Sequence, residues 1–229
     1  MKIAVCISGS TKHINSSLIS IERLKSIYDI DVFIHTWRIS DFNKFNECSG
    51  SKNTSFYCPL EIIKAYNPVK FIIEDYSDAY EYFKNKMEDY NYNTYYNDSI
   101  GPLSMFYSMY NCNLIKNSYY KKYDMNIRMR FDSKINSDIQ ILEKLDKSFL
   151  HIPQEMDYNG IHDQFAFGNT ELMNMYCNVI NDIEKTDRSV YHPEKILYEC
   201  LTYNSVPINR FAFSVGINGG PSSIGINNI

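Results

Sequence analysis

The sequence predicts an α/β fold, with one domain built on a central, mostly parallel sheet flanked by helices. The chain opens with a continuous apolar run at Ile3–Ile7, which is typical of a strand buried on both faces of a parallel sheet. After it, strand-like segments alternate with segments that repeat apolar residues at helical spacing, which favours βαβ units. The 229 residues suffice for one large domain with a substantial core.

The first unit is a strand, a turn, a helix and a second strand. The opening strand ends in the polar turn SGSTK, after which Ile14, Leu18 and Ile21 recur at near-helical spacing. The run DVFIHTW at Asp31–Trp37 then predicts a second strand. We expect a βαβ unit whose crossover is right-handed.

The pattern is weaker over the next part of the chain. Residues 38–60 are rich in Ser, Asn and Lys, which predicts a mobile surface loop. The segment PVKFIIEDY, with its apolar residues at Val69 and 71–73, predicts a third strand. The acidic, tyrosine-rich stretch at 77–99 shows only weak periodicity and predicts no element.

An amphipathic helix is predicted from about Pro102, since proline suits a first helical turn. Apolar and aromatic side chains then recur at helical spacing, which indicates a stripe that packs on the sheet. The members of this stripe are Leu103, Phe106, Tyr107, Tyr110 and Leu114.

The segment YDMNIRMRFDSKI at 123–135 alternates between apolar and polar side chains, which predicts one strand. Its apolar side carries Ile127, Met129 and Phe131. Its polar side carries Asn126, Arg128, Arg130 and Asp132. Two arginines and an aspartate on one face of a core strand indicate either a ligand site or a structural ionic network.

The last third of the chain predicts further strands and helices. We expect a strand at 149–153, a loop at 154–164, a helix whose stripe runs from Leu172 to Ile180, and a helix that begins at Pro193. Alternating apolar residues between 206 and 217 predict late strands.

We assign residues 1–217 to the domain and residues 218–229 to a C-terminal tail. The net charge of −4 argues against a nucleic-acid partner, because a nucleic-acid surface needs a basic stripe. No segment approaches the roughly 20 apolar residues of a membrane span. The N-terminal apolar run is too short for a signal peptide. These features predict a cytoplasmic protein.

The six cysteines form no CxxC pair and no tight Cys/His cluster of the kind that zinc needs. Four of them lie within apolar patterns and are expected in the core. These are Cys6, Cys112, Cys177 and Cys200. Cys48 and Cys58 lie in the polar loop and could pair, although free thiols are expected in a reducing compartment.

Ligands of open α/β sheets bind beyond the carboxyl ends of the strands, so the residues after each strand are candidates. After the first strand, the turn supplies backbone donors at Gly9, the hydroxyls of Ser8 and Ser10, and the ammonium group of Lys12. These groups suit a diphosphate or a ribose. An ordinary strand-to-helix turn explains the same residues equally well.

The second strand ends in His35 and Trp37, which point to one face. His35 is a candidate ligand contact, although a histidine beside aromatic residues is more often a satisfied structural residue.

The strand at 123–135 brings a carboxylate to the same edge. Asp132 would suit Mg²⁺ or Mn²⁺, which prefer hard oxygen ligands, and Lys134 lies close by. Arg128 and Arg130 could form forked hydrogen bonds to phosphate or fix the position of the carboxylate. The alternative is a buried Arg–Asp network with a purely structural role.

Taken in order, these segments resemble a family of small GT-A-type glycosyltransferases found in bacterial surface-polysaccharide gene clusters and in large DNA viruses. The resemblance is carried by DVFIHTW, by the R-x-R-x-D pattern that ends in Asp132, and by DQFAFG at 163–168. It covers roughly Lys2 to Leu201 and weakens around 38–60 and 76–100.

The resemblance implies a nucleoside diphosphate sugar as donor and a glycan hydroxyl as acceptor. The SGS turn would lie near the nucleotide, and Asp132 would replace the family's DxD motif with its Mn²⁺ or Mg²⁺. One aspartate stands where two are usual, so Asp132 could hold the metal alone, share it, or leave Lys134 and the arginines to neutralise the diphosphate. By the same resemblance, Asp163 faces the acceptor or the transferred sugar and would act as a base if the reaction inverts.

Two other functions remain open at this point. A nucleotidyltransferase or another donor-phosphate enzyme could use the same crevice, because one fold hosts several chemistries. A domain that only binds a nucleotide or a glycan is the second alternative, since one aspartate of the usual pair is missing.

Overall fold

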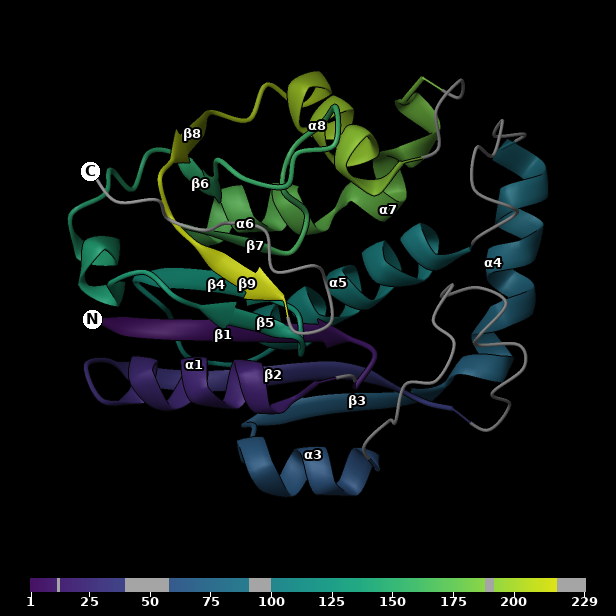
Figure 1. The fold of residues 1–229 in the computed structure, drawn as a ribbon. Helices are drawn as coiled ribbons and strands as arrows, with labels where there is room; N and C mark the ends of the chain where they lie inside the picture. Colours follow the sequence, from purple (N-terminus) through teal and green to yellow (C-terminus); the bar gives the residue numbers. More distant parts are fainter. Residues whose placement is uncertain (12, 40–57, 91–99, 188–191, 218–229) are drawn as a thin grey trace.

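The computed structural model describes residues 1–11, 13–39, 58–90, 100–187 and 192–217. A seven-stranded sheet lies at its centre, with helices on both faces (Figure 1). The tail predicted at 218–229, most of the loop predicted at 38–60, Cys48 and Lys12 fall outside the described residues. No helix in the described part of the chain is both long and apolar enough to cross a bilayer.

The strands of the main sheet follow the order β3-β2-β1-β4-β7-β6-β8. Their bounds are β1 Lys2–Gly9, β2 Asp29–Arg38, β3 Lys70–Asp75, β4 Met125–Met129, β6 Leu150–Pro153, β7 Phe165–Gly168 and β8 Ile208–Phe211. The first four strands are parallel, β7 runs antiparallel to β4 and β6, and β6 is parallel to β8. The prediction of an α/β fold with a mostly parallel sheet is confirmed.

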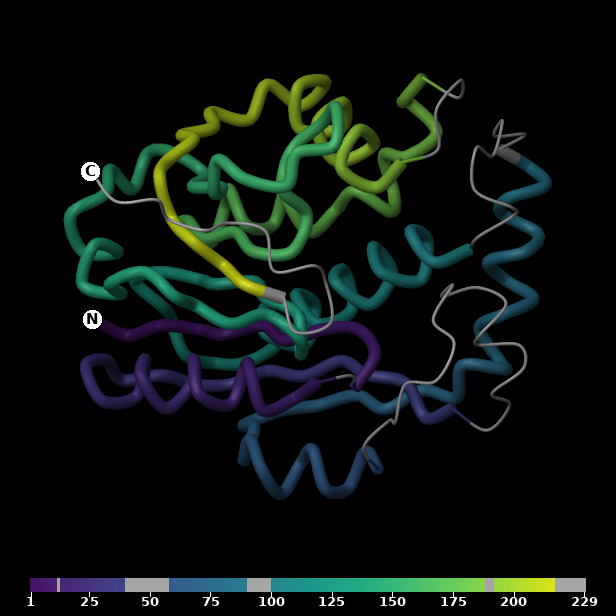
Figure 2. Tube along the Cα trace, viewed as in Figure 1, coloured from purple at the N-terminus to yellow at the C-terminus, as the bar shows by residue number. Residues whose placement is uncertain are grey.

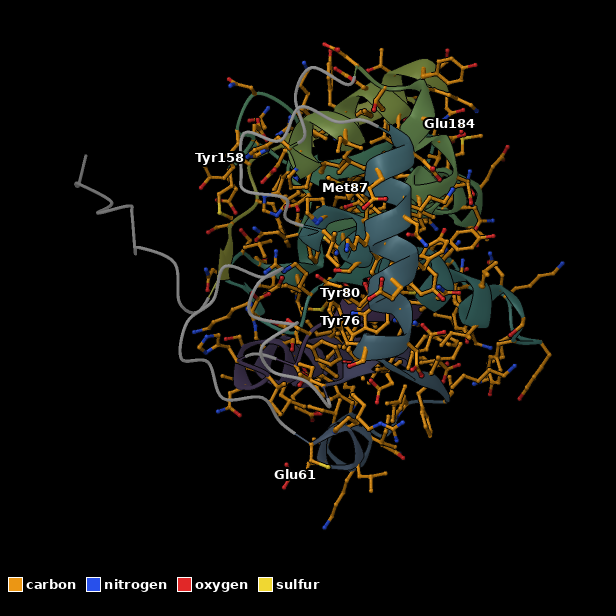
Figure 3. All side chains as sticks on the ribbon, turned by 90° about the vertical axis from the view of Figure 1, so that its right-hand side faces the viewer. Glu61, Tyr76, Tyr80, Met87, Tyr158 and Glu184 are labelled. Atoms are coloured by element: carbon orange, nitrogen blue, oxygen red, sulfur yellow. The ribbon has the colours of Figure 1, made fainter. Side chains whose placement is uncertain are left out.

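Helices α1 and α3 cover one face of this sheet, and α5 and α6 cover the other. The helices are α1 Asn15–Lys25, α3 Pro59–Tyr66, α4 Tyr76–Tyr90, α5 Gly101–Asn117, α6 Thr170–Cys177, α7 Val179–Asp182 and α8 Pro193–Tyr203, with short 3₁₀ helices at Ile139–Glu143 and Ile183–Lys185. Helix α4 stands at the edge where the parallel strands end, and it faces the viewer in Figure 3, with Tyr76 and Met87 labelled along it.

A small second sheet pairs β5, Ser133–Ile135, with β9, Val215–Ile217. Figure 2 follows the chain from α8 through β8 to β9, which returns beside this much earlier segment. Helix α1 holds the approach to β5, because the Ser17 hydroxyl donates to the Phe131 carbonyl at 2.6 Å and the Ser20 hydroxyl accepts from the Ile135 amide at 2.9 Å. The turn after β4 is thereby fixed to the helix that follows β1.

The prediction of a single strand over 123–135 is wrong. The structure ends β4 at Met129 and closes a turn in which the Ser133 amide donates to the Arg130 carbonyl at 3.2 Å. The apolar alternation survives the turn, because Phe131 is as fully buried as Ile127. A period-two pattern therefore continued past the end of the strand.

Several helices and one strand differ from the sequence prediction. Helix α3 begins inside the segment predicted as a loop. Helix α4 lies in the stretch for which the sequence predicted no element. At its start, the Asp75 carboxylate accepts a hydrogen bond from the Ser77 amide at 3.0 Å. Strand β7 was missed. The helix predicted over 172–180 is divided at Asn178 into α6 and α7.

The stripe predicted for α5 is only partly right. Leu103 and Phe106 are buried, but Leu114 is 43% exposed, and Met109 and Cys112 pack inward in its place. The four cysteines predicted in the core are all buried, and the described cysteines, including exposed Cys58, are free thiols.

Removing the Ser17 hydroxyl should destabilise the protein. The Ser17→Ala variant leaves the buried Phe131 carbonyl without this donor and the Tyr66 hydroxyl without its 2.5 Å partner, so we expect a loss of about 1–3 kcal/mol in the free energy of unfolding. Urea denaturation measures it. The control is Ser26→Ala, which removes an exposed hydroxyl bonded to the Arg23 carbonyl and should change the value by much less. Equal losses in the two variants would contradict the role of Ser17.

Candidate functional site

Four segments meet at the carboxyl edge of the sheet. Ile7 of β1 pairs with Met129 of β4, so the SGS turn continues beside the turn that holds Arg130 and Asp132. The loop at 154–164 joins β6 to β7 at the same edge. It contacts the start of α8, because the Ile161 amide donates to the Glu194 carbonyl at 3.0 Å.

Arg130 and Asp132 form a forked ion pair. The Arg130 Nε donates to Asp132 Oδ1 at 2.9 Å, and Nη2 donates to Oδ2 at 2.7 Å. The Asp132 side chain is 10% exposed and the Arg130 side chain 32% exposed, so Arg130 is the more accessible member of the pair. This pairing of a carboxylate with a neighbouring arginine is compatible with both interpretations of the strand end, the ligand site and the structural ionic network.

The residues present do not fit a metal ion held by protein side chains. Both oxygens of Asp132 are bonded to Arg130, and no three His, Cys, Asp or Glu side chains of the described residues lie close enough to hold one ion. We therefore derive no step that passes through a metal.

Arg130 lies in a field of carboxylates. Burial lowers the pKa of Arg130, but the charges of Asp132, Asp163 and Glu194 raise it by a larger amount. Its pKa is therefore above the ordinary value of an arginine. The guanidinium stays positive under all physiological conditions.

Arg128 is held differently from its neighbour. Its side chain has no exposed surface, and its Nη1 donates to the main-chain carbonyl of Asp163. A phosphate outside the protein does not reach this group without a rearrangement of the core. The forked contact with phosphate that the sequence suggested is therefore closed to Arg128, and for Arg130, whose Nε and Nη2 bond to Asp132, it stays a prediction.

Asp163 carries a carboxylate that no hydrogen bond or ion pair engages among the residues described. Its side chain is 4% exposed, and its carbonyl accepts from Arg128 and, at 3.3 Å, from the Tyr176 hydroxyl. The neighbouring His162 is fully buried, with Nδ1 3.0 Å from the Glu155 carbonyl. Burial lowers the pKa of His162, and the Asp163 charge opposes this only in part.

Glu194 is a site residue that sequence reasoning missed. It lies in the first turn of α8 and is 5% exposed, and burial, reinforced by the Asp163 charge, raises its pKa to about 8. The His192 Nδ1 is 2.7 Å from Glu194 Oε2, but the two groups are not aligned as a hydrogen bond. Burial lowers the pKa of His192. Burial therefore favours the protonated form of the Glu194 carboxyl and the uncharged form of His192.

The loop at 154–164 has a tightly specified backbone. Met156, Tyr158 and Asn159 have φ values of 53°, 40° and 67°, which side chains other than glycine adopt at a cost. A Cβ on Gly160 would lie 2.1 Å from the Glu194 main chain, so glycine is required for this contact. The Asp157 carboxylate accepts from the His162 amide at 3.2 Å and from Arg210 at 2.6 Å.

The turn after β1 supplies buried polar groups at the same edge. Ser8 is 1% exposed, and its hydroxyl has no hydrogen-bond partner within the described residues. Gly9 has a φ of 113°, in the region that favours glycine, and its carbonyl accepts from Thr36 at 2.8 Å. Ser10 is half-buried. Lys12 lies outside the described residues, so its predicted role stays a prediction.

His35 and Trp37 lie inside the protein. His35 has no exposed surface, and its ring nitrogens lie 2.7 Å from the Ser108 hydroxyl and 3.2 Å from the Glu74 carboxylate. Trp37 is 3% exposed and stacks on Tyr107 with 5.8 Å between ring centroids. These contacts are typical of structural residues. Contact of His35 or Trp37 with a nucleotide-sugar donor stays a prediction.

Lys134 was predicted from the sequence as a site residue, and a surface groove was not. Lys134 is half-buried on β5, opposite Gly216 of β9. A groove of about 640 Å³ lies at the ends of β2 and β3, lined among others by Arg38, Glu74 and Tyr107. No sequence signal pointed to this groove, because its walls come from three separate segments.

The structure is similar to solved glycosyltransferases. The match to mouse xyloside xylosyltransferase 1 has a TM-score of 0.40 and 12% identity, over 92% of this chain and 84% of that one. The match to the glycosyltransferase GlyE of Streptococcus pneumoniae has a TM-score of 0.45 and 9% identity, over 91% of this chain and 44% of that one. The match to the galactosyltransferase LgtC, in complex with donor and acceptor sugar analogs, has a TM-score of 0.44 and 13% identity, over 86% of this chain and 69% of that one.

This chain thus spans less than half of the pneumococcal protein. No protein-family model matches the sequence, and no curated protein matches it. All three solved structures are glycosyltransferases, the class that the sequence resembles. At TM-scores below 0.5 the likeness carries no argument about activity, which has to come from the site itself.

The raised pKa of Glu194 predicts how stability depends on pH. Between the ordinary pKa of a glutamate and about 8, the native state binds more protons than the unfolded chain, so the free energy of unfolding falls as pH rises. From pH 6.5 to 8.5 we expect the wild type to lose more than about 1 kcal/mol relative to Glu194→Gln. Burial lowers the pKa values of His162 and His192, and both histidines are present in the wild type and in Glu194→Gln, so their contribution cancels in the comparison.

Urea denaturation at several pH values measures this difference. The exposed Glu171 on α6 gives the control, since Glu171→Gln should follow the wild type. Parallel curves for the wild type and Glu194→Gln would show that Glu194 is not held protonated.

Proposed function

We propose that the chain is a glycosyltransferase, which moves a sugar from a nucleoside diphosphate sugar to a hydroxyl of a growing glycan. The observation that carries the proposal is the arrangement at the carboxyl edge. The partly exposed Arg130 side chain is paired with Asp132 and lies in the electrostatic field of Asp163, whose carboxylate no described side chain engages. The SGS turn lies alongside. This edge is where open α/β sheets bind their ligands.

The first requirement of the reaction is to stabilise the departing diphosphate. Arg130 supplies a fixed positive charge, and the N–H groups of its guanidinium outside the pair with Asp132, on Nη1 and Nη2, suit phosphate oxygens. Asp132 acts on the guanidinium and orients it. Lys134 and Lys12 are the further cations that we assign to the donor, together with the hydroxyls and amides of Ser8, Gly9 and Ser10.

The second requirement is a base for the acceptor. In an inverting transfer, the acceptor oxygen forms a bond to the anomeric carbon, the bond from that carbon to the diphosphate oxygen breaks, and the acceptor proton passes to the Asp163 carboxylate. The neighbouring groups support this assignment, because burial favours the uncharged forms of His162, His192 and Glu194. Among the described side chains, none bonds to the Asp163 carboxylate in competition with the acceptor.

The proposal predicts a large loss of transfer in Asp163→Asn. Removing a general base costs about 10²- to 10⁴-fold, so we expect at least a hundredfold fall in kcat at unchanged folding. The assay incubates the protein with a panel of nucleoside diphosphate sugars and oligosaccharide acceptors and measures acceptor-dependent release of nucleoside diphosphate. The control is Asp89→Asn, an exposed aspartate on α4, which should keep full activity.

Undiminished turnover by Asp163→Asn would remove Asp163 from the mechanism. Release of pyrophosphate from a nucleoside triphosphate, without release of nucleoside diphosphate, would instead identify a nucleotidyltransferase. Nucleotide binding without any turnover would identify a binding domain.

A further inference from the structure

Arg128 is a fully buried cation that bonds to a main-chain carbonyl. Its side chain has no exposed surface, and its Nη1 donates to the carbonyl oxygen of Asp163. Its Nε and Nη2 have no hydrogen-bond partner within the described residues. Such a group is expensive to bury, because desolvation of a charge is repaid only by good partners. An apolar residue would fill this position of β4 at lower cost, so stability alone does not explain the arginine.

Tyr176 of α6 directs a second donor to the same atom. Its ring has no exposed surface, and its hydroxyl donates to the Asp163 carbonyl at 3.3 Å. One carbonyl oxygen thus accepts from β4 and from α6, two elements that are far apart in the sequence. Two donors from different elements restrain this carbonyl oxygen, and with it the backbone from which the Asp163 side chain leaves.

The rest of the loop is anchored on the N-terminal side of this carbonyl. Gly160 and Ile161 pack on the main chain of Glu194, and Asp157 is bonded to Arg210. Between these anchors and β7, the Asp163 carbonyl is the point at which the backbone is tied to the core of the domain.

We propose that Arg128 and Tyr176 are positioning residues for Asp163, which they hold through its main-chain carbonyl so that its carboxylate meets the acceptor. The inference rests on the proposed function, because that function gives the Asp163 carboxylate its task. A displacement of about 1 Å at a reacting group can cost about a hundredfold in rate. The buried charge of Arg128 is then explained by its task, which is to keep the Asp163 carboxylate in one position.

The variant Tyr176→Phe removes one oxygen atom and keeps the buried ring. We expect kcat for transfer to fall at least tenfold, while KM for the donor stays unchanged, since the Arg130 side of the site is not touched. In the Asp163→Asn background the same substitution should cause no further loss, because both changes act through one carboxylate. Equal losses in the two backgrounds would overturn the proposal, since a general structural role adds independently.

Tyr28→Phe is the matched control. Tyr28 is also a buried tyrosine, 5% exposed, whose hydroxyl donates to a main-chain carbonyl, that of Ile139, at 3.1 Å. It lies just before β2, at the amino ends of the parallel strands and away from the candidate site, so Tyr28→Phe should leave kcat at the wild-type value. A loss of kcat like that of Tyr176→Phe would overturn the assignment.

Hydrogen exchange of the amides at 161–164 provides a second measurement that needs no activity. Tyr176→Phe should speed their exchange at least tenfold relative to Tyr28→Phe, and unchanged exchange would show that the carbonyl contact does not hold the loop. If the wild type transfers no sugar but the exchange rates respond, the proposed function fails while the anchoring of Asp163 stands. If Arg128→Lys folds, it should behave like Tyr176→Phe, because an ammonium group lacks the reach and fork of the guanidinium.

Discussion

The carbonyl group of Asp163 is the point on which the geometry of the candidate site depends. Donors from β4 and α6 converge on it, and the loop that carries it is fixed on its other side to α8. The turn that follows β4 is in turn bonded to α1 through Ser17. Two loops that follow different strands are therefore held in one relative position by the core, which is what a site with a donor and an acceptor requires.

The charge balance of the site follows from which groups are buried. Arg130 is partly accessible and remains charged, whereas the Glu194 carboxyl loses its charge because it is buried beside Asp163. Burial favours the uncharged forms of His162 and His192 beside them. The site thus combines the Asp163 carboxyl group, which no described side chain engages, with a partly accessible cation, Arg130, that is paired with Asp132. This pattern suits a reaction in which one group takes up a proton while another stabilises a departing anion.

The sequence predicted the sheet and much of the site, and its errors have physical causes. Apolar runs located β1 to β3, alternation located β4, and the polar face of the segment around Arg128 was recognised as unusual. The strand was extended too far because Phe131 points into the core from a turn. The buried face of α5 was misplaced at Leu114, because helical periodicity alone does not say how a helix is rotated on a sheet. Glu194 was missed because its neighbour Asp163 comes from a distant loop.

Ligand binding tests the central claim, that this edge holds a nucleoside diphosphate sugar, most directly. The melting temperature should be measured against a panel of nucleotides and nucleotide sugars, with Mn²⁺ and with a chelator, because a ligand that binds the native state raises it. We predict a rise with at least one nucleoside diphosphate sugar, and loss of that rise in Arg130→Met. No rise with any nucleotide under either condition would contradict the account and leave Arg130 and Asp132 as a structural pair.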